Sequence, residues 1–479
     1  MKQTQTIVVD LDGTLTPTDT LYESIVLLIK NNPFIVFFLL SWLLKGIAYF
    51  KSKVAENCNL DMATLPYNLQ LIEWLKEEKA NGKKIVLCTA ANERIASAVS
   101  EYLKIFDEVI ASDISINLKS ASKHEALENR FGNKGFDYAG NSKEDFDVWR
   151  SAHKAIVVNA SKSFLKKVKA ITVVSKIFPH QPIKPAHWRH MFRIHHWVKN
   201  LLLFVPLLAA HQFGDMQFFI SLLIAFVSFS LCASAVYMVN DLLDLNNDRM
   251  HSRKRYRPFA AAVIPIKYGI VLIPIFIIMS FALAMVVGSN FFICLMSYFV
   301  LTILYSFYLK RFVLIDCLTL AGLYTIRIIA GNAAVTAPVS FWLLGFSAFI
   351  FLSLAFVKRY AELLSQEQEG HSESYGRGYI LTDAKLLQTF GITAGYASVL
   401  VFALYVNSET VIKLYAQPEL IWFAVPLVLF WINWIWIRAH RGEMYDDPIV
   451  FALKDRTSQL SAIFLICIFL FSAANFTIS

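Results

Sequence analysis

The stretch Asn240-Asp-Leu-Leu-Asp-Leu-Asn-Asn-Asp248, which follows a long apolar run, decides the fold of the larger part of this chain. Residues four apart on a helix share a face, so Asn240, Asp244 and Asp248 should form one stripe. Carboxylate and amide oxygens are the ligands that Mg²⁺ prefers. Four basic residues follow within Arg253-Lys-Arg-Tyr-Arg257, and they suit a diphosphate bridged by Mg²⁺. The pattern predicts a magnesium diphosphate site at the end of a membrane helix.

Composition divides the chain into two parts. With 479 residues, 56% of them hydrophobic, the chain is too apolar for one soluble domain and long enough for two or three. The segment Pro179-His-Gln-Pro-Ile-Lys-Pro185 has three prolines in seven residues, which suits a linker. We therefore expect an α/β domain over 1–178 with a helical cap over about 16–66, a linker and interfacial helix over 179–196, and a transmembrane domain over 197–479.

Beyond the linker, nine apolar runs come near the roughly 20 residues that cross a bilayer. They lie at 198–211, 218–239, 266–288, 290–309, 313–332, 340–357, 388–406, 418–437 and 459–476. The first run is short, and the fifth contains Arg327. The runs predict an all-α transmembrane domain of nine helices.

Basic residues are distributed unequally between the loops of this topology. With the N-terminal domain in the cytoplasm, the cytoplasmic loops hold fifteen Lys or Arg residues, and the opposite loops hold only Lys413. The fifteen are Arg249, Arg253, Lys254, Arg255, Arg257, Lys310, Arg311, Lys358, Arg359, Arg377, Lys385, Arg438, Arg441, Lys454 and Arg456. This bias predicts a multi-pass protein of the cell inner (cytoplasmic) membrane with a cytoplasmic N-terminal domain. It also explains the net charge of +9 without nucleic acid as a partner.

The N-terminal domain alternates strands and helices, which predicts a parallel sheet with helices on both faces. The expected order is a strand at 7–10, a helical region to about 57, a helix at 68–80, a strand at 84–89, a helix at 92–102 and two further strand-helix units. Ligands of such sheets bind at the carboxyl ends of the strands. The polar residues expected there are Asp10, Asp12, Thr89, Lys123 and Asp145.

These residues resemble the motifs of the haloacid dehalogenase-like phosphatases, beginning with Val9-Asp-Leu-Asp-Gly-Thr14 and covering roughly 5–160. The resemblance implies a Rossmann-like α/β fold with a helical cap. It implies that Asp10 is the nucleophile that takes a phosphoryl group and that Asp12 is the acid and base. Thr89 would hydrogen-bond the phosphoryl oxygens, and Lys123 would neutralise their charge. Mg²⁺ would be held by Asp10, Asp12 and Asp145.

The sequence departs from that family at Asn141. The family usually has Gly-Asp-x-x-x-Asp, whereas this chain has Gly140-Asn141-x-x-x-Asp145. Asn keeps an oxygen ligand but loses a charge, so weaker metal binding is expected. Lys119 is a rival to Lys123 for the phosphoryl contact.

The run Phe34-Ile-Val-Phe-Phe-Leu-Leu-Ser-Trp-Leu-Leu44 is too short to span a bilayer. A single crossing there would also separate Asp10 from Thr89. Two alternatives remain for this run. It is a cap helix whose apolar face packs on the core, or it lies on the membrane surface.

The predicted stripe, with Asn240, Asp244 and Asp248, resembles a motif of the UbiA family of intramembrane prenyltransferases. Members of that family are nine-helix proteins in which this motif binds magnesium diphosphate. The second motif of that family lies between spans four and five, where this chain has Tyr305-Ser-Phe-Tyr-Leu-Lys310 and then Asp316. Enzymes of the family that ionise an allylic diphosphate usually present a second acidic pair. The single acidic residue weakens the interpretation as an ordinary prenyl transferase.

Several further strings are similar to the decaprenyl-phosphate phosphoribosyltransferase branch of that family, over nearly all of 185–479. They are Trp197 to Asn200, Arg253 to Pro258, Tyr305 to Asp316, Arg327 to Gly331, Lys358 to Glu362 and Gly376 to Tyr379. This resemblance implies transfer of phosphoribosyl from phosphoribosyl diphosphate to a polyprenyl phosphate, with release of diphosphate. Asp244 and Asp248 would be catalytic residues of this transfer.

Loss of diphosphate from a sugar C1 leaves oxocarbenium character, so the site must neutralise the leaving group and position the nucleophile. Metal ligands would be Asn240, Asp244 and Asp248. Candidates for binding the substrates are Lys199, Arg253, Lys254, Arg257, Tyr305 and Lys310, with Asp316 for metal or ribose.

Two further polar features lie in the membrane domain. An arginine within a span costs ~2.5–3.5 kcal/mol on insertion scales. Arg327 is therefore expected to line the site and to meet the lipid phosphate, with two alternatives: a structural pair, or an arginine near a helix end whose side chain extends to the membrane surface. Asp446 and Asp447 could touch the donor, but a solvated loop is the simpler interpretation.

The leading hypothesis joins the two halves in cell envelope biosynthesis: the membrane domain makes polyprenyl-phosphoryl 5-phosphoribose, and the phosphatase domain removes its 5-phosphate. One alternative is prenyl transfer from a polyprenyl diphosphate to an aromatic acceptor. Another is a degenerate phosphatase domain that serves as a scaffold. Mg²⁺ is the expected cofactor, membrane lipid is the expected partner, and assembly into a homo-oligomer is left open.

Overall fold

The computed structural model describes residues 6–113, 118, 120–179, 182–209, 216–335, 340–368, 378–444 and 447–473. Lys119, Arg377 and Asp446, which were named above, lie outside these described residues. The chain forms two compact units. Unit 1 comprises Met1–Phe192 together with Met238–Ile273, and unit 2 comprises Arg193–Tyr237 together with Pro274–Ser479.

Unit 1 is built around a six-stranded parallel sheet with the strand order β3-β2-β1-β4-β5-β6. The strands are β1 (Thr6–Val9), β2 (Lys84–Asn92), β3 (Glu108–Ser112), β4 (Phe136–Gly140), β5 (Ala155–Ala160) and β6 (Val174–Pro179). The expected parallel α/β sheet is confirmed. Strand β6 was not predicted, and it reaches Pro179, where a linker was expected to begin.

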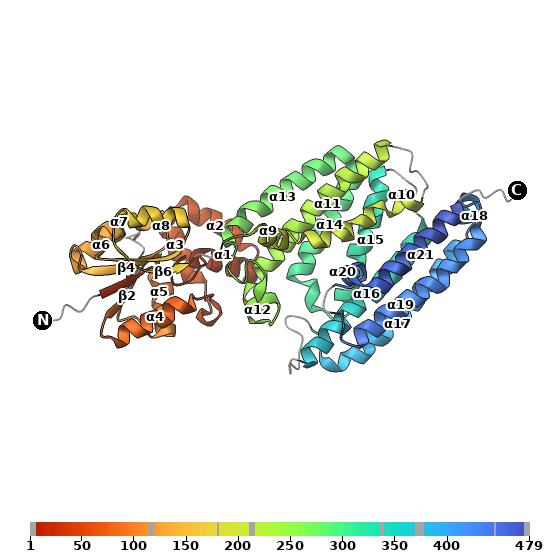
Figure 1. Cartoon of the computed structure of the whole chain (residues 1–479). Coiled ribbons are helices and arrows are strands. Elements are labelled where there is room, and N and C mark those ends of the chain that lie inside the picture. The colour runs from red at the N-terminus through yellow and green to blue at the C-terminus, as the bar shows by residue number, and fades with distance from the viewer. Residues whose placement is uncertain are drawn as a thin grey trace. The chain divides into compact units, whose positions relative to one another are not determined.

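Helices cover both faces of this sheet (Figure 1). Successive residues of each strand point to opposite faces, and because both sets are apolar, both faces must be buried. Ile7 and Val9 pack with α4 (Leu69–Ala80) and α5 (Glu93–Leu103). Val8 points to the other face, which is covered by α6 (Ala121–Phe131), α7 (Phe146–Ser151) and α8 (Lys162–Lys169). Residues at the carboxyl end of β1 are therefore held in the middle of a rigid layer.

Three helices follow β1, in the region expected to form a cap: α1 (Thr20–Asn31), α2 (Ile35–Leu44) and α3 (Ile47–Asn57). The run 34–44 forms α2, and only Leu39 of that helix is buried, in a cluster with residues of α1 and α3. Phe37 is 71% exposed and Leu44 is 90% exposed. The apolar face of α2 thus packs on its neighbouring helices along one stripe and leaves most of its large side chains uncovered.

The second segment of unit 1 contains the Asn240 to Asp248 motif. It runs from the end of α11 (Met216–Leu243) through α12 (Leu245–Met250) and the short 3-10 helix Lys254–Tyr256 to the start of α13 (Ile266–Val287). Arg249 of α12 forms an ion pair with Glu23 of α1, with 2.6 Å between Nη2 and Oε1. This ion pair ties two segments of unit 1 that are 226 residues apart in the chain.

The remaining helices are long and apolar, and eight helical segments of the described residues are long and apolar enough to cross a membrane. Their helices are α11, α13, α14 (Ser289–Phe307), α15 (Ile315–Val335), α16 (Phe341–Gln368), α17 (Ala384–Val406), α19 (Ala424–His440) and α21 (Arg456–Ala473). The first predicted run, 198–211, contains part of a 3-10 helix (Ile194–Phe204) and the short α10 (Val205–Ala209), and it extends beyond the described residues. The protein is a multi-pass membrane protein.

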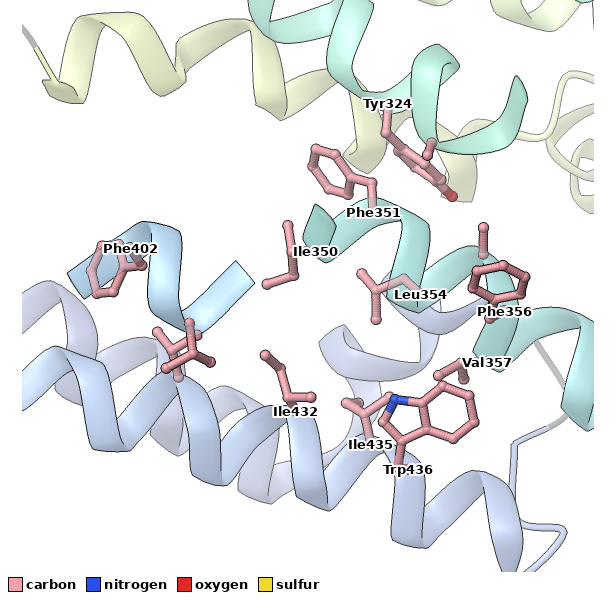
Figure 2. Close-up of a cluster of buried hydrophobic side chains, with 14 of the residues drawn as sticks. Tyr324, Ile350, Phe351, Leu354, Phe356, Val357, Phe402, Ile432, Ile435 and Trp436 are labelled. Atoms are coloured by element: carbon pink, nitrogen blue, oxygen red, sulfur yellow. The ribbon is translucent and has the colours of Figure 1, made fainter. Parts of the chain in front are cut away.

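The core of unit 2 lies between α15, α16, α17 and α19 (Figure 2). Tyr324 of α15 stacks on Phe351 of α16, with 5.0 Å between the ring centroids. Trp436 of α19 packs against Gly391 of α17, where a Cβ atom would lie 2.2 Å from the indole ring. A glycine at this position is what lets the indole approach the helix backbone.

Candidate functional sites

The polar residues predicted for the N-terminal domain meet at the carboxyl ends of β1, β2 and β4, as parallel strands require. Asp10 directly follows β1, and Thr89 lies in β2 beside it. Lys123 is on α6, and Asp145 is in the short 3-10 helix Lys143–Asp145 after β4. Asp10, Asp12, Thr89, Lys123 and Asp145 all line one cavity of about 610 Å³.

A buried hydrogen-bond network joins three of these residues through Tyr138. The Nζ of Lys123 donates to Oδ1 of Asp10 at 2.7 Å and to the hydroxyl of Tyr138 at 3.1 Å. That hydroxyl donates to Oδ1 of Asp145 at 2.8 Å. Burial opposes a charge on Lys123, but the charges of Asp10 and Asp145 raise its pKa. Lys123 is therefore a permanently charged group next to the candidate nucleophile.

The two carboxyl groups of the Asp10-Leu-Asp12 pair differ in acidity. Burial raises the pKa of Asp10 to about 6, although the nearby Lys123 lowers it. Burial and the charge of Asp19 raise the pKa of Asp12 to about 8. The pKa of Asp10 is the lower of the two because Lys123 favours its ionised form, which suits a nucleophile, and the higher pKa of Asp12 suits a general acid.

Asn141 is packed closely on the turn that carries the two aspartates. Its backbone N–H donates to Oδ2 of Asp145 at 3.0 Å, and Thr14 Oγ1 donates to its side-chain oxygen at 3.4 Å. A Cβ atom on Gly13, whose φ is +79°, would lie 2.1 Å from the Asn141 amide nitrogen. The Asn141 side chain therefore occupies the space that any side chain at position 13 would need.

The donor set of this cavity fits Mg²⁺. Asp10 and Asp145 both act on one buried cation, Lys123, and Asp12 lies near Asp10 in the same cavity. Among the described residues, no three His, Cys, Asp or Glu side chains stand close enough to hold a metal ion alone. Mg²⁺ usually takes one or two carboxylates and completes its shell with water and substrate phosphate. The cavity therefore suits Mg²⁺ that arrives with a phosphorylated ligand.

The predicted stripe at the end of α11 contains an irregularity. The α-helix ends at Leu243 and α12 begins at Leu245, with Asp244 between them. The backbone N–H of Asp244 still donates to the Asn240 carbonyl at 3.0 Å, and that of Asp248 donates to the Asp244 carbonyl at 2.8 Å. The helical hydrogen-bond spacing of four residues is kept across the end of α11, so Asn240, Asp244 and Asp248 remain on one side of the segment.

Arg257 of the basic cluster after this stripe contacts two carboxylates. Arg257 Nη1 donates to Oδ2 of Asp248 at 2.6 Å and to Oδ1 of Asp241 at 3.1 Å. Burial raises the pKa of Asp248 to about 6, against the opposing effect of Arg257. Arg253 is exposed and Lys254 is half-buried. Arg257 thus holds a candidate metal ligand in place, while Arg253 and Lys254 remain near the surface.

Asp447 is a buried centre of unit 2, which corrects the interpretation of this residue as part of a solvated loop. Lys199 Nζ donates to its Oδ2 at 2.7 Å, the Tyr324 hydroxyl donates to both carboxylate oxygens at 3.0 Å, and Lys358 Nζ lies 3.5 Å away. Burial alone would raise the pKa of Asp447, but Lys199 and Lys358 lower it. Lys199, a predicted donor contact, is therefore bound to a carboxylate.

Asp316 is also fully buried in unit 2 and is bound on several sides. Nε and Nη2 of Arg359 donate to its two carboxylate oxygens, and Tyr305 donates to Oδ1 at 2.9 Å. Arg359 also pairs with Glu362. The structure thus brings the predicted residues Tyr305 and Asp316 together. Lys310, in the 3-10 helix Leu309–Arg311, is half-buried.

Arg327 of α15 lies inside the bundle rather than at a helix end. Its Nε donates to the side-chain oxygen of Asn200 at 3.0 Å, and its Nη2 donates to the Tyr298 hydroxyl at 3.2 Å. The guanidinium carbon also lies 4.9 Å from the Tyr298 ring centroid and 5.3 Å from that of Phe229. Such a cage of aromatic and amide groups stabilises a buried cation.

Several polar residues of these clusters were not singled out from the sequence. Tyr138 lies in a buried strand and looks like an ordinary core tyrosine. Asp241 adjoins the motif but lies off the predicted stripe. The string Lys358 to Glu362 was noted only for its resemblance, and the pairing of Arg359 with Asp316 depends on how α15 and α16 pack.

Comparisons with known proteins give the following matches. The model of the UbiA prenyltransferase family matches residues 201–454. An uncharacterized protein of Sinorhizobium fredii is 33% identical, covering 94% of this chain and 88% of its own length. The decaprenyl-phosphate phosphoribosyltransferase of Mycobacterium tuberculosis is 34% identical, covering 56% of this chain and 87% of its own length. A solved UbiA homolog from Archaeoglobus fulgidus bound to GPP and Mg²⁺ is 15% identical with a TM-score of 0.46, covering 59% of this chain and 99% of that chain.

Proposed function

On the premise that this chain belongs to the UbiA prenyltransferase family, we propose that its membrane domain transfers phosphoribosyl from phosphoribosyl diphosphate to a polyprenyl phosphate. The relatives named decaprenyl-phosphate phosphoribosyltransferase support this choice of substrates. The observation that carries it is the state of Asp316, which is fully buried and held by Arg359 and Tyr305. A carboxylate held in this way does not offer the second acidic metal site that ionisation of an allylic diphosphate would require.

In this transfer, an oxygen of the polyprenyl phosphate attacks C1 of the ribose, and the bond from C1 to the diphosphate oxygen breaks. Asn240, Asp244 and Asp248 would hold Mg²⁺, which supplies positive charge to the departing diphosphate. Arg253 and Lys254 neutralise its phosphates from the same segment.

Other residues position the reacting groups. Arg257 orients Asp248 through the 2.6 Å hydrogen bond. Lys199, Tyr305 and Lys310 are assigned to donor binding, and Arg327 is assigned to the lipid phosphate. Asp316 acts through Arg359 and Tyr305 rather than as a metal ligand.

We further propose that the domain formed by residues 1–178 is a haloacid dehalogenase-like phosphatase that removes the 5-phosphate of the product. The carboxylate of Asp10 attacks phosphorus, the ribose oxygen leaves, and Asp12 gives that oxygen its proton. Water then cleaves the aspartyl phosphate while Asp12 takes a proton from the water. Lys123 and Thr89 contact the phosphoryl oxygens, and Asp10 and Asp145 would hold Mg²⁺. This second step draws a reversible transfer forward.

The charge bias of the loops supports a location in the inner membrane with residues 1–178 in the cytoplasm. In this arrangement residues 179–196 connect the phosphatase to the transmembrane domain 197–479. Both reactions then occur on the cytoplasmic side of the membrane.

The test uses the purified full-length chain in lipid nanodiscs. One reaction contains labelled phosphoribosyl diphosphate and polyprenyl phosphate, and a parallel reaction contains polyprenyl diphosphate and labelled 4-hydroxybenzoate. We expect labelled lipid only in the first reaction. Labelled lipid only in the second reaction would refute the transferase proposal. Asp244→Asn should abolish the transfer, whereas Asn247→Ala, in the same segment but off the stripe, should retain it.

The phosphatase step is tested in the same reaction by the phosphorylation state of the lipid product. The parent chain should release inorganic phosphate, whereas Asp10→Asn should accumulate polyprenyl-phosphoryl 5-phosphoribose. Asp147→Asn, which changes an exposed carboxylate of α7 outside the cavity, is the matched control. If the parent chain releases no phosphate from any candidate substrate, the domain acts as a scaffold and the phosphatase proposal is wrong.

A further inference from the structure

The cavity that holds Asp10 is lined by two segments of unit 1 that lie far apart in the sequence. Besides the strand ends, its wall includes Ile47 and Lys51 of α3 and the residues Pro265, Ile266 and Lys267. Ile266 and Lys267 are the first two residues of α13, a helix long and apolar enough to cross the membrane. The first turn of such a helix lies at the surface of the bilayer. Part of the cavity wall is therefore at the level of the lipid headgroups.

The charged groups of the cavity form two clusters. Lys123 and Asp145 act on Asp10, as their effects on its pKa show. Asp19 lies at the other cluster, where Lys51 and Lys267 both lower its pKa against the larger effect of burial. Asp12 lies between the clusters, since both Asp19 and Asp10 act on it. The second cluster places Lys51 and Lys267 at the cavity wall beside Asp19, and these two lysines are the charges that can bind an anion.

An apolar surface adjoins this second cluster. Ile47 lines the cavity and is itself 60% exposed at the start of α3. Exposed large side chains precede it at Phe34, directly before α2, and along α2 at Phe37, Phe38, Leu40, Leu43 and Leu44. On a multi-pass membrane protein, an apolar surface of this kind is explained by contact with the bilayer.

The volume of the cavity limits what can enter. About 610 Å³ lies within the range of about 300–1,000 Å³ that small-molecule sites occupy. That volume accommodates a phosphorylated sugar with a second phosphate group. A polyprenyl tail must remain outside, where the apolar surface and the bilayer are.

We propose that Lys51 and Lys267 form a second anion subsite in this cavity, which binds the phosphodiester of a lipid-linked sugar phosphate while the phosphomonoester lies against Asp10 and Lys123. The cavity then selects substrates that carry both phosphates and are anchored in the bilayer. This inference rests on the proposed phosphatase function and names the substrate class of that site. Lys267 is a specificity-determining residue and takes no part in bond breaking.

The subsite is tested by binding rather than by turnover, so that it can be judged apart from the phosphatase activity. The full-length chain with Asp10→Asn is reconstituted in phosphatidylcholine nanodiscs. Affinities are measured for ribose 5-phosphate, which has one phosphate, and for its 1-(methyl phosphate) derivative, which has two. Loss of one charge-assisted contact corresponds to about tenfold in affinity.

Adding Lys267→Gln should reduce the preference for the two-phosphate ligand about tenfold. Lys51→Gln should act in the same direction. Lys162→Gln removes an exposed lysine outside the cavity and should leave the preference unchanged. If Lys267→Gln weakens both ligands equally, or weakens neither, the subsite is refuted.

The lipid anchor is tested with the parent chain by comparing phosphate release from polyprenyl-phosphoryl 5-phosphoribose in the nanodisc with release from the methyl compound in solution. Faster release from the lipid-linked compound at equal total concentration is expected. Equal rates would refute the selection for an anchored substrate. Absence of release from both compounds would overturn the phosphatase function. The existence of the subsite would still be decided by the effect of Lys267→Gln on the preference for the two-phosphate ligand.

Discussion

Removal of one partner of the Glu23–Arg249 ion pair should strongly destabilise unit 1. The Arg249 side chain is 8% exposed and that of Glu23 is 2% exposed, so neither charge is well hydrated. Nη2 and Nη1 of Arg249 donate to the two carboxylate oxygens at 2.6 and 3.1 Å. Arg249→Gln would leave Glu23 with a hydrogen bond from Thr18 at 2.8 Å and an uncompensated buried charge.

The magnitude follows from the contacts that are lost. Two hydrogen bonds to a charged group, at about 1.5–3 kcal/mol each, amount to about 3–6 kcal/mol. Breaking a buried ion pair by removal of one partner typically costs about 3–5 kcal/mol. The double variant Glu23→Gln with Arg249→Gln buries no charge, so it should recover much of that loss.

The assay is labelling of Cys88 along a urea series, with the full-length chain in detergent micelles and the labelled peptide identified by mass spectrometry. Cys88 is fully buried in β2, so its thiol reacts only when the sheet opens. A loss of about 3 kcal/mol should raise the labelling rate in native buffer by about 150-fold. The reasoning is refuted if both single variants lie within about 1 kcal/mol of the parent, or if the double variant is no more stable than the weaker single variant.

The Gly13 turn, the Asp447 carboxylate and the expected metal can each be tested directly. Gly13→Ala should destabilise the turn by about 1–3 kcal/mol, because a Cβ would lie 2.1 Å from the Asn141 amide at a φ of +79°; the same labelling assay checks this, and Asn141→Gly should restore part of the loss. Asp447→Asn should lower stability by about 3–5 kcal/mol, because it leaves Lys199 buried without its carboxylate; thermal aggregation in detergent is the measurement, and an unchanged midpoint would contradict it. EDTA should stop release of both diphosphate and inorganic phosphate, and added Mg²⁺ should restore both; release that persists in EDTA would exclude Mg²⁺ as the required ion.

Local patterns were sufficient where the chemistry depends on secondary structure. The parallel sheet follows from alternating strands and helices, and it brings Asp10, Thr89 and Lys123 to one cavity without knowledge of any long-range contact. The stripe of Asn240 and Asp244 likewise follows from the helical repeat, and it tolerates the end of α11 because the backbone hydrogen bonds keep their spacing.

Partners set by packing between distant elements could not be predicted in this way. Asp447 lies 248 residues from Lys199, and no periodicity relates them. Arg359 meets Asp316 only because α15 and α16 pack together. Strand β6 ends in Pro179, a residue that suggests a linker and that is tolerated here at the sheet edge.

The discontinuous make-up of unit 1 has a consequence for the order of events during synthesis. Glu23 leaves the ribosome 226 residues before Arg249, which at about 5–20 residues per second means a wait of about 11–45 s. During that time the first part of unit 1 carries a carboxylate whose partner does not yet exist, and α11, a helix long enough to cross the membrane, is synthesised in between. The ion pair that joins the two segments of unit 1 can therefore form only after a complete membrane helix has followed the sheet domain out of the ribosome.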